Sequence, residues 1–563
     1  MFRKNLFLLG VLCSHVSFAQ LDKQPSTFDQ HLKPKAAATP EVAMMTRFGT
    51  IKISEYTGVP DISIDLHTIK EGDFEIPITL RYHASGNSVE QEATIVGLSW
   101  DLTLGGSGLT QINSGILDQD NALAADYTTY QTLMAKGESD NDRIIWPSMQ
   151  VPFSNTRSED APEHRFTHFA FCTRPDCSTP FNINTINDLR LKDWGRPNRY
   201  SLSLPGGSCE FMMDLYAKTI IPVGNKSEHY FIKQEVSANK YSPSWSVQDI
   251  KGNYYFFSEN DVENTHDEFN WQSYGTITNK LSYVKVASGK MIQFQYMDGK
   301  YYNSTYSESK IWDDKAAISP LISTGNVSTT EYNVKYLSQI ETETEKVVFE
   351  LSTTQAERAD LRAASLPNGY GAKRVNAIHV WDKRSNRKLK SFIFTYDYFN
   401  ADLSYSGIQN TVTDFLTKRL KLISVQEIGY ASDGIAVNDI PPHTFEYEEG
   451  IQLPRKDSYA RDFWCMFNGQ NNNSLLPNIR SEIATGLLGL DTKSVYGRVG
   501  IAQVLQNLSS GGTANKGMSE PHAQANILRK VKYSSGGATV YTYQANRYNN
   551  YRTFAANEFL QEE

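Results

Sequence analysis

The residues best suited to chemistry lie in one short stretch, where two histidines and two cysteines follow one another closely. His164, His168, Cys172 and Cys177 are all side-chain types that zinc accepts. Their spacing matches no standard zinc finger, and two close cysteines in an exported chain more often form a disulfide. The pattern therefore predicts a local Cys172–Cys177 disulfide and no metal site.

Catalytic motifs are missing from the rest of the sequence. It contains neither a Gly-x-Ser-x-Gly elbow nor a His-Glu-x-x-His pair. The glycines of 105–108 lack the strand–loop–helix order of a phosphate-binding loop, so we interpret them as turns. The acidic pairs at 140–142 and 259–261 do not continue into an EF-hand. We therefore expect no enzyme activity and no cofactor.

Three tryptophans are candidate sugar-stacking residues: Trp245, Trp271 and Trp381. An exposed indole offers a flat apolar face to the C–H face of a sugar ring, whereas a buried indole contributes to a core. The sequence alone leaves both interpretations open.

Composition sets the class of protein that must position these side chains. Among 563 residues, 40% are hydrophobic, 21% are charged and 12% are aromatic, with 31 Tyr and 27 Phe. Aromatic residues favour strands, and this apolar fraction suffices for a packed core. The formal net charge of -8, without a basic run, argues against a nucleic-acid partner.

The first residues resemble a secretory signal. Positive charges at Arg3 and Lys4 precede an apolar run at 6–12 and a small-x-small cleavage site at 17–19. We expect a signal peptide at 1–19 and an exported mature chain, found at the cell surface, outside the cell or in the periplasm. No later segment is apolar and long enough for a transmembrane anchor.

Alternating apolar residues and turn signals predict a mostly β fold of antiparallel sheets and stacked hairpin repeats, sandwich-, propeller- or spiral-like, with few short helices. The expected helices lie at 122–136 and near 357–362. The expected hairpins, each running from an aliphatic strand through a turn to an aromatic strand, are 281–296, 336–349, 375–396, 420–447 and 527–543. The expected regions are a flexible leader (20–45), an N-terminal β domain with one helical insertion (46–245), a hairpin-repeat region (246–450) and a C-terminal β region with long loops and a final hairpin (451–563).

Several motifs appear in one order along most of 46–548. They are the stretches 48–64 and 77–86, Val96-Gly97-Leu98-Ser99-Trp100, Lys418-Arg419-Leu420-Lys421-Leu422, Asp462-Phe463-Trp464, Asn468-Gly469, Leu476-Pro477 and Tyr533-Ser534-Ser535-Gly536-Gly537. In these residues the chain resembles the N-terminal part of exported bacterial RHS/YD-repeat proteins, ending before the main repeat tract.

The resemblance implies a non-catalytic exported shell or scaffold module. It also implies a partner, namely a repeat-rich or effector protein encoded nearby. The alternative is a cell-surface adhesin or carbohydrate-binding module that binds surface glycans through exposed aromatic residues.

Two further cysteines stand where the family pattern has glycine. Cys209 follows a Gly-Gly-Ser turn, and Cys465 follows the Trp of the Asp-Phe-Trp motif. A turn glycine often has a positive φ, which cysteine adopts only at a cost. A Cys209–Cys465 disulfide would compensate for that cost, and two independent thiols are the alternative.

Overall fold

A computed structural model describes thirteen stretches of the chain. They are residues 53–54, 57–104, 108–112, 198–205, 207–214, 219–223, 229–235, 243–266, 272–312, 321–363, 371–437, 440–477 and 513–545. The chain divides into two compact units, 1–60 and 61–563. The expected signal peptide, leader and helix at 122–136 lie outside the described residues, as do Cys172, Cys177 and Trp271.

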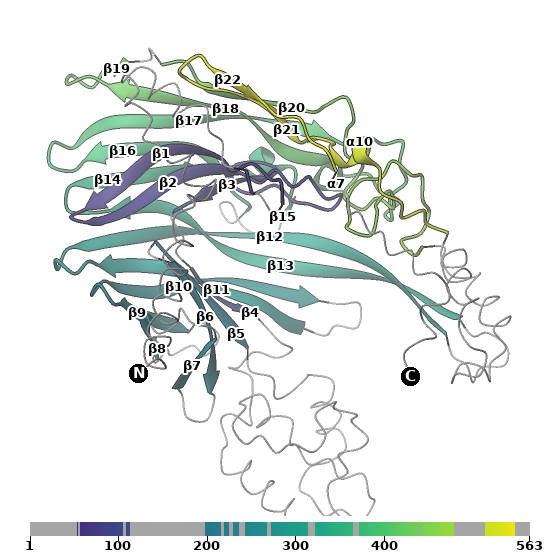
Figure 1. The fold of residues 1–563 in the computed structure, drawn as a ribbon, viewed down its shortest axis with the longest axis horizontal. Helices are drawn as coiled ribbons and strands as arrows, with labels where there is room; N and C mark the ends of the chain where they lie inside the picture. The colour runs from purple at the N-terminus through teal and green to yellow at the C-terminus, as the bar shows by residue number, and fades with distance from the viewer. Residues whose placement is uncertain are drawn as a thin grey trace, which may run out of the picture. The chain divides into compact units, whose positions relative to one another are not determined.

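In the described part of the second unit most residues lie in antiparallel strands, as predicted (Figure 1). Its first strands are β1 (Ile62–Glu71), β2 (Phe74–Tyr82), β3 (Trp100–Thr103), β4 (Gly108–Ile112), β5 (Arg199–Leu204), β6 (Gly207–Asp214), β7 (Thr219–Val223), β8 (Tyr230–Glu235), β9 (Ser244–Asp249), β10 (Tyr254–His266) and β11 (Gln272–Lys285). There follow β12 (Met291–Trp312), β13 (Leu321–Glu341), β14 (Glu345–Leu351), β15 (Arg362–Ala363), β16 (Val375–Asp382), β17 (Arg387–Asn400), β18 (Lys418–Tyr430), β19 (Ala436–Val437), β20 (His443–Tyr447), β21 (Leu528–Lys532) and β22 (Ala538–Val540).

Helices are short in the described residues. They are the 3-10 helix η5 (Gln355–Arg358), α7 (Asp414–Thr417) and α10 (Glu520–Ala523). Helix η5 lies at the position predicted near 357–362, and a capping box of Thr354 and Glu357 begins it. Among the residues that the structure describes, none forms a helix long and apolar enough to span a membrane.

A small sheet contains β1, β2 and β3 in that order. Strand β1 alternates buried and exposed residues from Ile62 to Leu66, and β2 pairs with it in an antiparallel register from Ile62–Tyr82 to Glu71–Phe74. The small sheet contacts the hairpin region, because His67 of β1 bonds Glu345 of β14 at 2.8 Å. The period-2 pattern read from the sequence is confirmed here.

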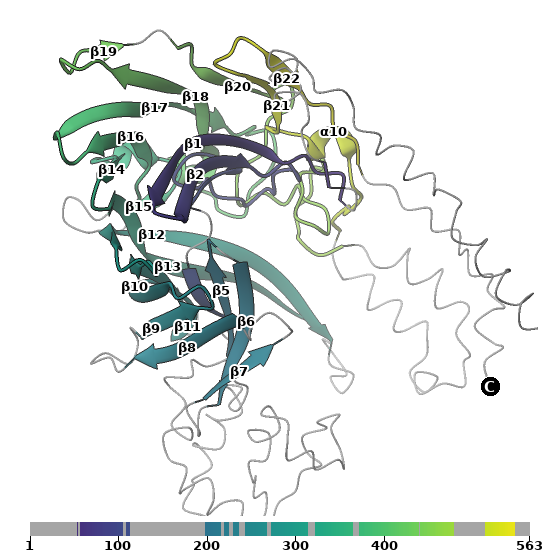
Figure 2. The ribbon, with the colours of Figure 1, turned by 60° about the vertical axis from the view of Figure 1, so that its left-hand side comes forward.

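The remaining strands form one large hydrogen-bonded network. Strands β4 to β7 pair in sequence and join β11 through β4, while β14, β16, β17, β18, β20, β21 and β22 continue from β13. The network closes into a ring of β10, β11, β12 and β13, since β10 pairs with β11 and β13 and so does β12. Figure 2 shows the small sheet beside β14 and β16.

All five predicted hairpins are present. They correspond to the pairs β11–β12, β13–β14, β16–β17, β18–β20 and β21–β22, each antiparallel. Strands from the expected 46–245, 246–450 and 451–563 regions join the same network, through β4–β11 and β20–β21. The exact region boundaries stay a prediction.

Four hairpin turns share one backbone geometry. The first residue of the turn donates its N–H to the carbonyl four residues later, and a glycine at the fourth position donates back to that first residue, all at 2.8–3.0 Å. These glycines, with their φ values, are Gly252 (86°), Gly289 (91°), Gly434 (82°) and Gly536 (90°). A three-residue loop closed by a left-handed glycine suits the twist of a hairpin.

Replacing Gly536 by alanine should lower the free energy of unfolding by about 1–2 kcal/mol, because a side chain at this φ is strained. No atom lies within 4 Å of the added Cβ, so the lost stability reflects the strain of the backbone conformation and not a steric clash. The matched control is Gly537→Ala, whose φ is not left-handed and which should be neutral or slightly stabilising. Urea denaturation of both variants measures the difference, and equal losses would contradict the turn assignment.

A buried junction joins the small sheet to late parts of the chain. The indole Nε1 of Trp100 donates to Tyr447 Oη at 2.8 Å, and Tyr447 Oη donates to the carbonyl of Leu422 at 2.7 Å. The backbone N–H of Leu528 donates to Tyr82 Oη at 2.9 Å. We call the residues from 82 to 100, with their partners in β18, β20 and β21, the N-to-C junction.

Candidate functional site

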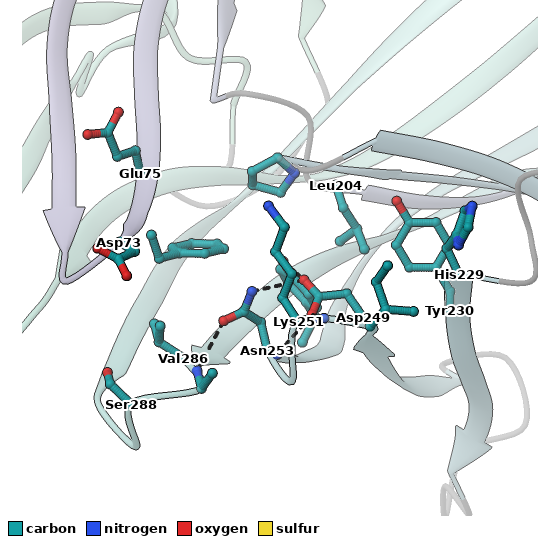
Figure 3. Close-up of a pocket in the computed structure, with 15 residues that line it drawn as sticks. Asp73, Glu75, Leu204, His229, Tyr230, Asp249, Lys251, Asn253, Val286 and Ser288 are labelled. Carbon is teal, nitrogen blue, oxygen red and sulfur yellow. Dashed lines mark hydrogen bonds between the residues drawn. The ribbon is translucent and has the colours of Figure 1, made fainter.

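One pocket of about 620 Å³ opens where five strand ends meet. We call it the turn pocket. Its lining comes from the β1–β2 turn (73–75), the end of β5 (204–205), the start of β8 (229–230), the β9–β10 turn with the start of β10 (249–251, 253 and 255) and the β11–β12 turn (286–288). Figure 3 shows these side chains around a common space.

The floor of the turn pocket is fixed by the carboxylate of Asp249. One oxygen accepts the backbone N–H groups of Lys251 and Asn253 at 2.9 Å each, and the other accepts Asn253 Nδ2 at 2.9 Å and Tyr255 Oη at 3.0 Å. Asn253 Oδ1 accepts the N–H of Ala287 at 3.0 Å, which connects two neighbouring turns. These polar groups hold the backbone in place and have little capacity left for a ligand.

An apolar wall stands beside this floor. Phe74 and Tyr255 are buried with their ring centroids 6.1 Å apart, and Leu204 and Val286 are buried as well. Burial raises the pKa of the Tyr255 phenol far above its usual value, and the neighbouring Asp249 carboxylate adds to the shift. The phenol therefore stays protonated and donates to Asp249.

A second set of polar side chains at the rim has no partner within the described part of the chain. Asp73, His229, Lys251 and Ser288 are exposed, and their side chains form no hydrogen bond or ion pair there. Figure 3 shows Lys251 extending into the space between Asp73 on one side and His229 on the other. These groups are available to a molecule in the pocket.

A different cluster of ionisable groups consists of four buried residues and the partly exposed Glu92. We call Glu92, Arg358, Asp360, Arg419 and Lys456 the buried charge cluster. Arg358 Nε and Nη2 donate to the two oxygens of Asp360 at 2.9 and 3.2 Å, and Lys456 Nζ donates to the carbonyl of Asp360 at 2.6 Å. Arg419 Nη2 donates to the carbonyls of residues 89 and 454.

Two pKa values in the buried charge cluster are displaced in opposite directions. Burial raises the pKa of Glu92 from 4.5 to about 7, against the attraction of Lys456 and Arg358. Burial lowers the pKa of Lys456 from 10.5 to about 8, against the attraction of Glu92 and Asp360. The void beside Glu92 and Lys456 measures only about 10 Å³, so it has no room for a substrate and the cluster acts as a structural link.

The free energy of unfolding should fall as the pH rises from 4.5 to about 7, because folded Glu92 retains a proton that the unfolded chain releases. Other groups titrate in this range, so the test is the difference between wild type and Glu92→Gln at pH 5 and pH 7. The variant should lose less stability across this range. The control, Glu446→Gln, changes a carboxylate whose side chain is 58% exposed and should leave the wild-type pH dependence unchanged.

The candidate tryptophans occupy different environments. Trp245 in β9 is fully buried, with its ring centroid 5.1 Å from Tyr200 and 5.7 Å from Phe211. It therefore has no exposed face for a sugar ring, and core packing is its role. Trp381 in β16 is half-buried, with the ammonium groups of Lys346 and Lys388 over its ring at 5.7 and 5.1 Å.

The candidate disulfide between Cys209 and Cys465 is not formed, and the two residues are independent free thiols. Cys209 is buried in β6 opposite Leu202, whereas Cys465 lies in a loop where its carbonyl accepts the N–H of Val89. Cys465 does have the left-handed conformation expected of a glycine position, with φ 63°. Cys209 lies in a regular strand, and burial raises the pKa of its thiol to about 11.

In the described part of the chain, no group of three or more His, Cys, Asp or Glu side chains could hold a metal ion. The zinc alternative at 164–177 lies outside those residues.

Comparisons with known proteins give partial structural likenesses, of which two are described. No protein-family model matches the chain, and no curated protein matches it. A solved structure titled "Crystal Structure of TcdB2-TccC3" matches 71% of this chain with a TM-score of 0.30 and 11% identity, and this chain covers 17% of its length. The N-terminal domain of the effector protein SpvB from Salmonella typhimurium strain LT2 matches 66% of this chain with a TM-score of 0.29 and 11% identity, and 99% of that domain is covered. TM-scores this low do not indicate a shared function, so only this chain's own residues bear on its function.

Proposed function

We propose that this chain is a non-catalytic, exported scaffold module of the RHS/YD-repeat type that works with a separately encoded repeat-rich or effector protein. The observation that supports this proposal is where the motifs of the RHS/YD-repeat resemblance lie in the fold. Residues 96–100 and 418–422 meet at the N-to-C junction, where they bond each other instead of facing a cavity.

The contacts between these motifs are close. Leu98 donates its N–H to the carbonyl of Leu420 at 2.8 Å. Gly97 has a φ of 121°, and a Cβ added to it would lie 3.2 Å from the backbone nitrogen of Leu422. A glycine is needed here for both conformation and space. Residues in such contacts hold the fold together, which suits a scaffold function.

The partner is proposed to bind at the ends of the strand network. Among the described strands, β22 pairs with β21 alone, and β7 pairs with β6 alone. An edge strand presents unpaired backbone groups that another strand can bond. A repeat-rich protein made of similar hairpins has the chemistry to extend such an edge.

The proposal is tested by cross-linking in the producing cells, followed by purification of the tagged full chain and mass spectrometry. We expect an envelope or secreted fraction, an N-terminus at Gln20, and cross-links from β7 or β22 to a protein with the same aliphatic–turn–aromatic hairpin pattern. A tagged exported protein of unrelated fold is the control. A cytoplasmic chain that retains Met1, or one that forms no such cross-link, would contradict the proposal.

The alternative, a surface adhesin with tryptophans as its sugar platform, has less support. Trp245 belongs to the core, and lysines lie over the ring of Trp381. A glycan site at these two residues is therefore not favoured.

A further inference from the structure

We propose that the turn pocket is a binding site for a neutral carbohydrate. This site would be separate from the tryptophans considered above, and it does not depend on the scaffold function. Its volume of about 620 Å³ falls within the range of roughly 300–1,000 Å³ typical of small-molecule sites. A short oligosaccharide has a suitable size for this space.

The polar groups of the pocket divide into two sets, which is the first argument for a ligand. Asp249 and Asn253 use their side chains to fix the turns. Asp73, Lys251 and Ser288 line the same space and have no partner within the described part of the chain. Rigid turns that hold unpaired polar groups around one cavity reduce the ordering cost of binding.

The mixture of charges defines the ligand class. Asp73 would repel an anion at one side of the pocket, and Lys251 would repel a cation near its centre. A sugar hydroxyl both donates and accepts hydrogen bonds, so it can pair with a carboxylate, an ammonium group or a serine without a net charge. A neutral polyol satisfies all of these groups together.

The apolar wall supplies the second requirement of a sugar site. Tyr230 at the start of β8 lines the pocket half-exposed, and the buried rings of Phe74 and Tyr255 support the wall from beneath. The C–H face of a pyranose can pack on the Tyr230 ring, while its hydroxyls point to the polar rim. The pocket therefore offers both surfaces that a sugar ring presents.

The test is titration calorimetry of the mature full chain with a panel of trisaccharides. The neutral probes are cellotriose, maltotriose, xylotriose and mannotriose, the anionic probe is sialyllactose, and the cationic probe is the glucosamine trimer. We expect saturable binding of at least one neutral probe and at least roughly tenfold weaker binding of both charged probes, because each would bring a charge next to a pocket group of the same sign.

Pocket variants locate the binding. Lys251→Met and Asp73→Asn keep the side-chain size close to the original. Each should weaken binding of the neutral probe by roughly tenfold, because a ligand hydroxyl loses a charged partner. Tyr230→Ala should weaken it as well by removing the half-exposed ring. The matched control is Lys532→Ala, an exposed lysine of β21 outside the pocket, which should bind as the wild type does. Circular dichroism of each variant confirms that it is folded.

Three results would overturn the proposal. The first is that no neutral probe binds at millimolar concentration. The second is tighter binding of sialyllactose or the glucosamine trimer than of every neutral probe. The third is binding that folded Lys251→Met and Asp73→Asn variants leave unchanged. None of these results bears on the cross-linking test of the scaffold function.

Discussion

Replacement of Arg358 by alanine should lower the free energy of unfolding by about 3–5 kcal/mol, the typical cost of removing one partner from a buried ion pair. Arg358 is 1% exposed and Asp360 is fully buried. The guanidinium also donates to the carbonyls of Lys373 at 2.7 Å and Ala93 at 2.9 Å. The variant leaves a buried carboxylate and two carbonyls without these donors. Urea denaturation followed by circular dichroism at pH 7 measures the loss.

The matched control for Arg358 is an arginine at the surface. Arg529 is 3.9 Å from Glu448, with its side chain 63% exposed. Exposed pairs of this kind contribute roughly 0–1 kcal/mol, so Arg529→Ala should stay near wild-type stability. If the two alanine variants lose similar amounts of stability, the buried charge cluster does not stabilise the fold.

Replacement of Trp100 by alanine should cost about 3–5 kcal/mol, as large-to-small changes of buried aromatic residues do. Its ring is fully buried, with centroids 4.5 Å from Phe445 and 5.1 Å from Tyr82. The change leaves a cavity at the N-to-C junction and removes the donor to Tyr447. The midpoint of thermal or urea unfolding reports the loss.

Trp464 provides the comparison within the same chain. Its side chain is 74% exposed, so Trp464→Ala removes a similar group without creating a cavity and should change stability by less than about 0.5 kcal/mol. Trp100→Phe should fall between the two alanine variants, because it keeps most of the packing and loses the indole N–H. A loss in Trp464→Ala as large as that in Trp100→Ala would contradict the burial assigned to these residues.

The local part of the fold could be predicted from the sequence because it depends on near neighbours. The alternation from Ile62 to Leu66 sets which side of β1 is buried, and a glycine such as Gly289 marks where a hairpin turns. Each signal spans a few residues. The five hairpins were therefore predictable.

The long-range part could not be predicted in this way. Nothing near Trp100 indicates that its partner is Tyr447, and a buried arginine such as Arg358 has the same side chain as a solvated one. The turn pocket combines five separate segments of the chain, so its existence depends on the strand order. One local signal was available for its floor, namely the Asp249-Ile250-Lys251-Gly252-Asn253 turn, although the ligand-facing role of Lys251 depends on the tertiary structure.

The N-to-C junction also has a consequence for the order of folding. Its hydrogen bonds join residues separated by 347 positions, Trp100 with Tyr447, and by 446 positions, Tyr82 with Leu528. A hairpin closes within about 1–10 μs, whereas contacts between distant residues form slowly because the entropy of loop closure opposes them. During synthesis the ribosome must also add Leu528 before its N–H can donate a hydrogen bond to Tyr82. The part of the small sheet around Tyr82 and Trp100 therefore stays open to water, and to other unfolded chains, until β20 and β21 are available to cover it.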